Sequence, residues 1–434
     1  MSLRGVGLIT EYNPFHNGHV YHVEQARVAS GADVVVAAMG GHFLQRGEPA
    51  LIDKWERTRM ALSCGVDVVV ELPFPWGCNS APHFAAGALE VLHAFSPHLD
   101  CFCFGSESGT LEELQRMAAA ISSTAAEEGE ALHFRRGTNY PAARQERLRQ
   151  SNVGQRSTTV ATAATFDLQA PNNILGLAYL RALAAAPHID LQPFTIARIG
   201  GSFHACKPQS TDIASATAVR HMLAQQEDIT PYVPAVSARI LHLAQCHGNI
   251  SDMERWFMLV AAGCLRSNVV GGEDADTQIY QFQPGLRARF LQAALHATTY
   301  AELVDGAKAR HLTRTRVQRL LCYAALGVTP AQMELHLKAG VPFIPLLGAS
   351  ARGEAFLRQC RASMKLPLVG NFSRVNALLK RHYHSAPAML RQAHQLLELH
   401  NRSARMYSLL LPGWKGGSRH LDYMRDPLRS ADLG

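Results

Sequence analysis

Short, nearly continuous apolar runs that are rich in valine alternate with helix-like segments along about the first hundred residues. The strand-like runs are residues 6–10, 32–39, 66–73 and 99–105, and the helix-like segments between them are 17–30, 54–65 and 79–95. Strands that are buried on both faces give continuous apolar runs, and parallel strands need helical crossovers. The pattern therefore predicts an α/β domain, Rossmann-like, whose parallel sheet is covered by helices on both faces.

The remaining elements predicted for this domain are helices over 110–150 and 171–186, a last strand over 191–199, and a helix that begins within 211–220. From about residue 235 the sequence changes to Leu- and Ala-rich amphipathic segments with few strand signals. We therefore predict an α/β domain over 1–225 and a mostly α-helical domain over 226–434. The tail, 411–434, is rich in Gly and charge and is expected to be extended or poorly ordered.

The charges are divided unevenly along the chain. Residues 308–434 carry 20 Lys and Arg against 6 Asp and Glu, a formal net charge of +14. Residues 1–307 carry 22 Lys and Arg against 29 Asp and Glu, a formal net charge of −7. A basic segment of this kind predicts a polyanionic partner, with nucleic acid the leading candidate and a solvated basic helical surface the alternative.

Composition excludes several other classes of protein. Hydrophobic residues make up 47% and charged residues 18% of the chain, which is typical of packed domains rather than disordered or fibrous proteins. The sequence has no apolar run long enough to span a membrane, and its first apolar run is too short for a signal peptide. Nine Cys without CxxC pairs favour reduced thiols in a cytoplasmic protein. Cys101 and Cys103 share a strand face, so we interpret them as small core residues rather than metal ligands.

The segment TEYNPFHNGHVYH, residues 10–22, follows the first predicted strand and contains His16, Gly18 and His19 in an HxGH pattern. Glycine lets the backbone approach a ligand, and a helix N-terminus offers free N–H groups to phosphate. Two imidazoles one helical turn apart can donate hydrogen bonds to phosphoryl oxygens as charge develops there. Pro14 stiffens the loop that leads in. We therefore interpret this turn as a phosphate-binding element.

Two other interpretations of these histidines remain. His16, His19 and His22 have the i, i+3, i+6 spacing of possible metal ligands, but no carboxylate or Cys completes a recognisable set. They also fit ordinary surface histidines.

A second anion site is predicted about two hundred residues later, where Ser215 and Thr217 precede Arg220 at a helix start. Hydroxyls, backbone N–H groups and a guanidinium converge in such a turn. The two turns together, one after the first strand and one after the last, resemble the HIGH-type nucleotidylyltransferase superfamily. That resemblance implies attack on the α-phosphate of ATP, an adenylate, and release of pyrophosphate.

Longer blocks narrow the resemblance to one family. Over nearly all of residues 5–220 the chain is similar to the tRNA(Met) cytidine acetate ligases, in the ordered blocks GLITEYNPFHNGHVYH, GHFLQRGEPALIDKWERTRMAL, GVDVVVELP, FGSESG and PNNILGLAYL. The resemblance implies that acetate attacks ATP to give acetyl-adenylate and pyrophosphate. The acetyl group then passes to the wobble cytidine of elongator tRNA(Met), giving N4-acetylcytidine. ATP is then a substrate, Mg²⁺ is expected with it, and acetate and the tRNA are the other partners, with no membrane involved.

The resemblance also assigns roles to residues. His16, His19 and Arg220 are the expected catalytic residues, facing the phosphates. The expected ATP-binding residues are Ile9, Thr10, Glu11, Tyr12, Asn13, Pro14, Phe15, His16, Asn17, Gly18, His19, Val20, Tyr21, His22, Gly105, Asn173, Arg198, Ser215 and Thr217. Asn172 is a less favoured candidate than Asn173 for the ATP-binding asparagine. The alternative role for either residue is to cap the N-terminus of the helix that follows. No resident metal is expected.

Several residues have open interpretations. Arg46 and Lys54 are basic candidates near the phosphates or the tRNA, with a solvated surface position equally favoured. Glu71 is a candidate for orienting substrate or binding magnesium, although a hydrogen bond at the sheet edge is preferred. Ala216 stands where related transferases often place a second Ser, so one phosphate contact is left to the backbone.

Two other functions compete with the ligase. One is a small-molecule adenylyltransferase of the same superfamily, for which the large basic segment has no use. The other is a non-catalytic RNA-binding protein that keeps a nucleotide-binding fold.

Overall fold

The structure is a computed structural model of the whole chain. It describes residues 2–121, 167, 170–198, 212–266, 278–283, 285–310, 312–414 and 421–433. The helix predicted over 110–150 is seen as α5, Leu111–Ile121, and its remaining part lies outside the described residues.

Five parallel strands form the centre of the fold. They are β1 (Gly5–Thr10), β2 (Val34–Gly40), β3 (Val68–Leu72), β4 (Leu99–Ser106) and β5 (Gln192–Ala197). Their order in the sheet is β5-β4-β1-β2-β3, with β1 in the middle and all pairings parallel. Every residue of β1, β2 and β3 is buried. The five predicted strands are therefore confirmed, with bounds that differ by at most two residues.

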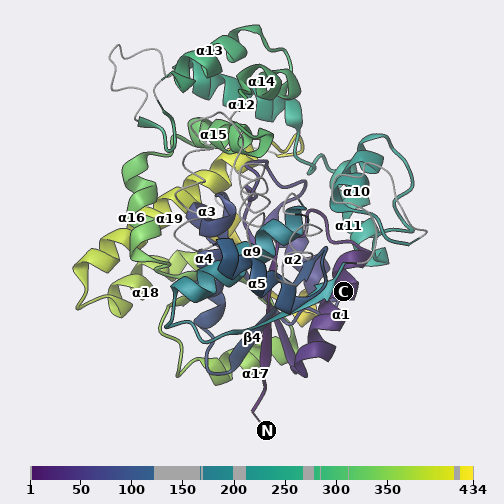
Figure 1. The fold of residues 1–434 in the computed structure, drawn as a ribbon, viewed down its shortest axis with the longest axis vertical. Coiled ribbons are helices and arrows are strands. Elements are labelled where there is room, and N and C mark those ends of the chain that lie inside the picture. Colours follow the sequence, from purple (N-terminus) through teal and green to yellow (C-terminus); the bar gives the residue numbers. More distant parts are fainter. Residues whose placement is uncertain are drawn as a thin grey trace, which may run out of the picture.

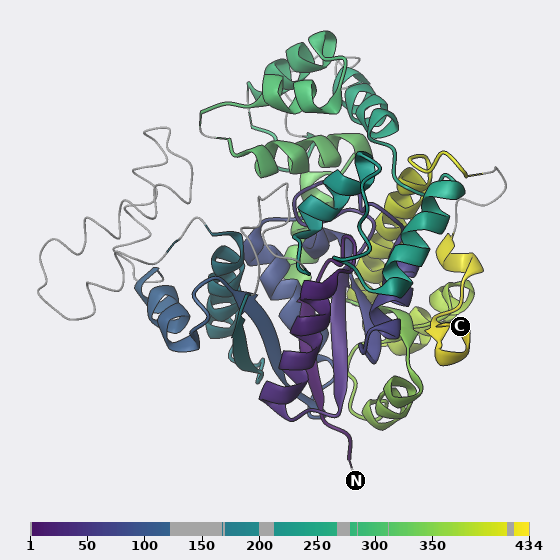
Figure 2. The ribbon, with the colours of Figure 1, turned by 90° about the vertical axis from the view of Figure 1, so that its right-hand side faces the viewer.

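Helices cover both faces of this sheet (Figures 1 and 2). One face packs on α1 (Asn17–Ser30), α2 (Lys54–Ser63), α10 (Ala216–Ala224) and α11 (Ala235–Cys246). The other face packs on α4 (Ala81–His93), α5, α9 (Pro171–Ala185) and α17 (Ala351–Cys360). Alternate residues of β2 enter the two cores, Val34 and Val36 on one side and Val35 and Ala37 on the other. Apolar residues at every position of the strand are what a sheet buried on both faces requires.

A third core lies among later helices. It is built mainly from α12 (Met253–Arg266), α13 (Leu286–His296), α14 (Tyr300–Ala307) and α15 (Arg314–Leu326). Figure 1 shows these four helices grouped at one end of the molecule, and α16 (Pro330–Ala339) and α19 (Pro387–Ser408) connect them to the rest. The helical character predicted beyond residue 235 is confirmed for this part of the chain.

The C-terminal part also contributes strands, which the sequence did not predict. Strand β6 (Ile344–Ala349) pairs antiparallel with β3, and it pairs in parallel with β7 (Leu368–Val369) and β8 (Leu428–Arg429). Residues of β6, α17 and α18 (Val375–His382) belong to the same core as β2 and α4. The C-terminal segment therefore completes the sheet as well as forming the helical group.

The expectation of an extended tail is wrong for residues 421–433. This segment contains α20 (Leu421–Met424), strand β8 and a 3-10 turn, Ser430–Leu433, and it lies beside the sheet (Figure 2). Asp422 is buried there, and its charge is compensated by an ion pair with Lys54 in the interior. Short elements also lie at Phe74–Gly77 (α3) and at Phe372–Arg374.

Two further expectations concern composition. Cys101 and Cys103 are buried in the core under α1, as predicted for small core residues, and the Cys within the described ranges form no disulfide. Within the described residues, no helix combines the length and the apolar character that a bilayer crossing needs.

Candidate active site

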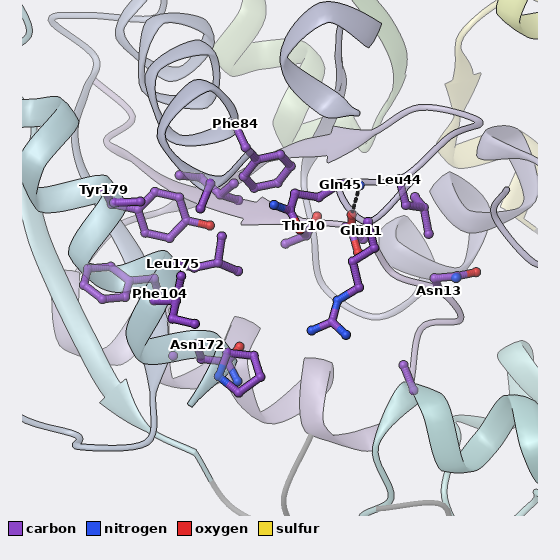
Figure 3. A pocket seen from close by; sticks show the side chains of 18 of the residues that line it. Thr10, Glu11, Asn13, Leu44, Gln45, Phe84, Phe104, Asn172, Leu175 and Tyr179 are labelled. Carbon is purple, nitrogen blue, oxygen red and sulfur yellow. Dashed lines mark hydrogen bonds between the residues drawn. The ribbon is translucent and has the colours of Figure 1, made fainter. Parts of the chain in front are cut away.

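A large cavity opens at the carboxyl ends of β1, β4 and β5 (Figure 3). Its volume is about 1870 Å³. Its lining comes from the β1–α1 loop, the segment after β2, the ends of β4 and β5, the N-terminal parts of α4, α10 and α15, and one side of α9 along its whole length. The carboxyl ends of parallel strands are where doubly wound sheets bind ligands, since the loops there diverge to either face. The predicted HxGH turn lies in this cavity.

His16 and His19 are fixed by the first turn of α1. His16 is the N-cap residue, and its Nδ1 accepts a hydrogen bond from the Gly18 N–H at 3.1 Å. The Nδ1 of His19 accepts one from the His16 N–H at 3.2 Å. A Cβ atom on Gly18 would lie 2.9 Å from Cε1 of His16, so only glycine leaves room for the folded-back imidazole. The HxGH spacing is thus a reciprocal helix cap built from two imidazoles.

This arrangement fixes the protonation of both rings. Because each Nδ1 accepts a backbone N–H, the proton of each neutral ring is on Nε2. Burial lowers the pKa of His16 to about 3, with further lowering by Arg198 and Arg220, and burial also lowers the pKa of His19 well below 6.5. The rings lie 3.8 Å apart between centroids. The turn therefore presents two neighbouring neutral donors, the Nε2–H groups of His16 and His19, to a ligand in the cavity.

The second predicted anion site meets the first. Ser215 is the N-cap of α10 and accepts a hydrogen bond from the Ala218 N–H. Arg220 donates from Nη1 to the Asn13 carbonyl oxygen at 2.7 Å and from Nη2 to the Thr217 hydroxyl at 3.3 Å. Burial lowers the pKa of Arg220, and the carboxylates of Glu48 and Glu11 partly offset this lowering. Arg220 thus ties the two turns together while lining the cavity.

The start of α1 is anchored to the second site by Asn17. Its Nδ2 donates to the carbonyl oxygens of Asp212 at 2.8 Å and Pro231 at 2.9 Å. Two turns about two hundred residues apart are brought together by these contacts, which involve backbone acceptors and leave no signal in the sequence.

The ends of β4 and β5 form another wall. A Cβ atom on Gly105 would lie 3.3 Å from Cγ of Arg198, and both residues line the cavity. Asn172 lines it too, and its Oδ1 accepts a hydrogen bond from Arg198 at 3.4 Å. Asn173 is buried beneath, where its Oδ1 accepts from the N–H groups of Glu107 and Ser108. The N-cap of α9 is Ala170, so neither asparagine caps that helix.

Most of the predicted ATP-binding residues line the cavity. The exceptions are the five residues Pro14, Phe15, Asn17, Val20 and Asn173. Phe15 is instead packed in the core under α1, and Asn17 bonds to the segments on either side of α10. Arg46, an open candidate from the sequence, also lines the cavity.

Sequence reasoning missed a group of lining residues that come from other elements. They include Gln45, after β2, Phe84 of α4, Tyr179 of α9, and Arg316 and Arg319 of α15. Phe84 and Tyr179 occur in apolar helical patterns that also fit core residues. The TRTR run at the start of α15 was visible as part of the basic segment, but its position depends on tertiary packing.

Lys54 and Glu71 lie in a separate, buried cluster. The Nζ atom of Lys54 pairs with Oε2 of Glu71 at 2.6 Å and with Asp422, and His400 lies against all three. These two carboxylates raise the pKa of Lys54 despite burial, and Lys54 holds the pKa of Asp422 well below its usual range. Lys54 is fully buried and does not line the cavity, so its candidacy for contact with phosphate or tRNA is wrong.

The same cluster resembles a metal site in its residue types. Glu71, His400 and Asp422 offer ligand atoms within 4.8 Å of one another. The Lys54 ammonium already occupies the position that a cation would take. The cluster is therefore an interior ion-pair network that ties the tail to α2 and to the end of β3.

Comparisons with known proteins agree with this site. Residues 3–419 match the model of the HIGH Nucleotidyl Transferase family. The chain is 45% identical over 428 residues to the tRNA(Met) cytidine acetate ligase of Syntrophotalea carbinolica, covering 98% of this chain and 99% of that protein. It is 33% identical over 417 residues to the tRNA(Met) cytidine acetate ligase of Bacillus subtilis, covering 94% and 92%.

A solved structure shows the same fold. The crystal structure of Thermotoga maritima TmcAL bound with alpha-thio ATP matches with a TM-score of 0.87 and 29% sequence identity, covering 98% of this chain and 99% of that one. The similarity extends over the helical group and the tail as well as over the sheet domain. The chain belongs to the tRNA(Met) cytidine acetate ligase family, a family of HIGH nucleotidyl transferases.

Proposed function

We propose that this protein activates acetate with ATP and transfers the acetyl group to the wobble cytidine of elongator tRNA(Met). In the first step a carboxylate oxygen of acetate attacks the α-phosphorus of ATP, and pyrophosphate leaves. In the second step the N4 amine of the cytidine attacks the acetyl carbon, AMP leaves, and N4-acetylcytidine forms. The pair of neutral imidazole donors at the HxGH turn is the observation that carries the proposal.

The first step needs positioning and charge stabilisation more than covalent help. Negative charge moves onto the departing pyrophosphate, and the Nε2–H groups of His16 and His19 are fixed before the reaction begins. Arg220 adds a permanent positive charge beside them. Neutral histidines suit this task, because they donate hydrogen bonds at physiological pH without first having to gain a proton in a buried site.

Mg²⁺ is expected to arrive with the nucleotide. The carboxylates in the described lining are Glu11 and Glu48, and each already accepts a hydrogen bond, from the Gln45 N–H and the Gln318 amide respectively. These residues do not form a dedicated set of ligands for a hard cation, so phosphate oxygens and water would supply most of its coordination. We assign no catalytic step to the ion.

The tRNA must bring one base into the cavity while its backbone stays on the surface. A single base can enter only after it leaves the anticodon stack. The segment with a net charge of +14 would hold the phosphates, and its helix α15 places Arg314, Arg316 and Arg319 in the cavity wall. Electrostatic attachment of this kind weakens steeply as salt rises.

Acetate-dependent exchange of labelled pyrophosphate into ATP tests the first step without tRNA. We expect exchange with acetate, and none with acetate omitted or replaced by a phosphate ester. Exchange that depends on a phosphate ester would identify a small-molecule adenylyltransferase instead. Absence of both ATP binding and exchange, with tRNA binding intact, would identify a non-catalytic RNA-binding protein.

A further inference from the structure

The cavity is larger than one nucleotide requires. Pockets for ligands of this size are commonly about 300–1,000 Å³, and this cavity is about 1870 Å³. The phosphate-binding groups His16, His19 and Arg220 come from helices on one face of the sheet, α1 and α10. The cavity continues past the end of β1 toward α4 and α9, which cover the opposite face. That far end extends beyond the groups assigned to the phosphates, so it offers a place for a second substrate.

The far end is apolar and aromatic. Phe84 of α4 and Tyr179 of α9 line it, with Leu175 and Phe104 beside Tyr179 (Figure 3). Both aromatic side chains belong to the hydrophobic core, at 2% and 4% exposure, so they form a fixed apolar wall rather than open stacking faces. A base that has left the anticodon stack has flat, largely apolar faces that fit against such a wall.

Two polar groups interrupt this apolar surface. The Tyr179 hydroxyl points into the cavity (Figure 3) and forms no hydrogen bond with any of the described residues. Burial and the nearby Glu11 carboxylate raise the pKa of Tyr179, so the hydroxyl keeps its proton and acts as a donor. Glu11 accepts the Gln45 N–H through Oε1 at 2.7 Å, which fixes the carboxylate and leaves Oε2 for a ligand.

A carboxylate and a hydroxyl donor fit the pairing edge of cytosine. That edge carries one amine, which donates, and two acceptors, N3 and O2. The Glu11 carboxylate can accept a hydrogen bond from the N4 amine, and the Tyr179 hydroxyl can donate one to N3 or O2. Uracil has an oxygen in place of the amine, so it would put an acceptor against the carboxylate and leave its Oε2 without a donor. Burial raises the pKa of Glu11, and the nearby guanidinium groups of Arg46, Arg57 and Arg220 partly offset the rise.

We infer that the target cytosine is bound at this far end beside Phe84, that the Tyr179 hydroxyl donates a hydrogen bond to one of its acceptors, and that the Glu11 carboxylate accepts a hydrogen bond from its N4 amine and takes the proton during acetyl transfer. This inference rests on the proposed function and names the binding site of its acceptor base. In the transfer step the bond between N4 and the acetyl carbon forms. The bond from that carbon to the AMP oxygen breaks, and its electron pair leaves with AMP. The N4 proton moves to the Glu11 carboxylate, so Glu11 acts as a catalytic residue.

Binding of two anticodon stem–loops, one with cytosine and one with uracil at the wobble position, tests the base recognition. By fluorescence anisotropy we expect the wild-type protein to prefer cytosine by about tenfold. Glu11→Gln should reduce the preference to about twofold, because a neutral amide both donates and accepts. Glu90→Gln is the matched control, because Glu90 also accepts a backbone N–H, from Val341, but lies outside the cavity. It should keep the wild-type preference.

Tyr179→Phe tests the hydroxyl. It should weaken binding of the cytosine stem–loop by about three- to tenfold, whereas Tyr300→Phe should not. Tyr300 is a suitable control because its hydroxyl is also buried without a hydrogen-bond partner in the described structure, and it lies outside the cavity. Equal losses for the two variants would contradict the assigned role of Tyr179.

Single-turnover transfer from preformed acetyl-adenylate tests the proton acceptor. Glu11→Gln should slow transfer by about a hundredfold or more and remove the decline of the wild-type rate at acid pH. If the protein makes N4-acetylcytidine but Glu11→Gln keeps both the cytosine preference and the acid decline, this inference fails and the proposed function stands. If no acetylcytidine forms under any condition, the proposed function itself fails.

Discussion

At the scale of single residues, the site depends on imidazoles whose hydrogen bonds are made to backbone. The sequence showed two histidines at phosphate-binding spacing, but it did not show that each ring caps the helix through Nδ1. The glycine between them was predicted for close approach of a ligand. The structure adds that a side chain there would collide with His16. Motif spacing can therefore be read from sequence, whereas tautomer and charge state need the folded environment.

Replacing one imidazole without losing the cap separates these roles. His16→Asn keeps an oxygen that can accept the Gly18 N–H, since Asn is a favourable N-cap residue, but it lacks the Nε2–H donor. We expect acetate-dependent pyrophosphate exchange to fall about 10²- to 10³-fold, with little change in melting temperature. His83→Asn on α4, outside the cavity lining, should leave exchange near wild type. Equal exchange rates for both variants would contradict the role given to His16.

Buried neutral histidines also make stability depend on pH. Burial lowers the pKa of His336 to about 4, and the side chain does not line the cavity. In the unfolded chain it takes a proton below about pH 6.5, whereas in the folded protein it stays neutral down to about its lowered pKa. Stability is therefore lost as pH falls, by about 2 kcal/mol at pH 5 for this residue.

His336→Met should remove that part of the loss. Urea unfolding of the variant and wild type at pH 7 and pH 5 measures it. The drop in unfolding free energy between the two pH values should be about 2 kcal/mol smaller in the variant. An identical drop in both proteins would show that His336 is protonated equally in the folded and unfolded states.

At the scale of helices and strands, prediction succeeded where one segment's own pattern decides its structure. The central strands β1, β2 and β3 are nearly continuous apolar runs, and this pattern is visible without knowing their partners. Strand β6 was missed because Ile344–Ala349 contains Pro345 and lies among helical segments. It forms because the edge of β3 offers it unpaired backbone groups. The candidate site was likewise predictable only in part. The turns after β1 and before α10 could be recognised from the sequence, whereas α9 and α15 contribute lining residues whose positions depend on packing.

Helix α15 leads to a prediction about the tRNA. Its first turn faces the cavity, and it carries Arg316 into the lining. Arg316→Ala should raise the Kd for tRNA about three- to tenfold and lower the slope of log Kd against log salt by about 1. Arg358→Ala is the control, because Arg358 lies on α17 at the other end of the molecule and pairs with Glu354 on the surface. The account is wrong on this point if both variants weaken binding equally.

At the scale of the whole molecule, the C-terminal segment extends the sheet and closes over the active-site domain. The uneven charge distribution indicated a basic partner-binding region, but it did not reveal that the same region supplies β6 and β8. The buried pairing of Lys54 with Asp422 joins the tail to α2. Charge counts do not distinguish an interior ion pair from a surface one, so Lys54 was misjudged from sequence.

Breaking this ion pair should destabilise the protein. Asp422→Asn leaves the buried Lys54 ammonium with less compensating charge, and we expect a loss of about 3 kcal/mol or more in unfolding free energy by urea denaturation. Asp426→Asn, on the exposed part of the same tail, should change it by less than about 0.5 kcal/mol. A loss of similar size from the two substitutions would show that the tail is not anchored through Lys54.

The most direct test of the central claim is nucleoside analysis of elongator tRNA(Met) after incubation with the purified protein, ATP and isotope-labelled acetate. We predict N4-acetylcytidine at the wobble position that carries the label, requires both ATP and acetate, and is strongly reduced with the His16→Asn protein. Wobble cytidine that stays unmodified while the protein binds both ATP and the tRNA would contradict the account.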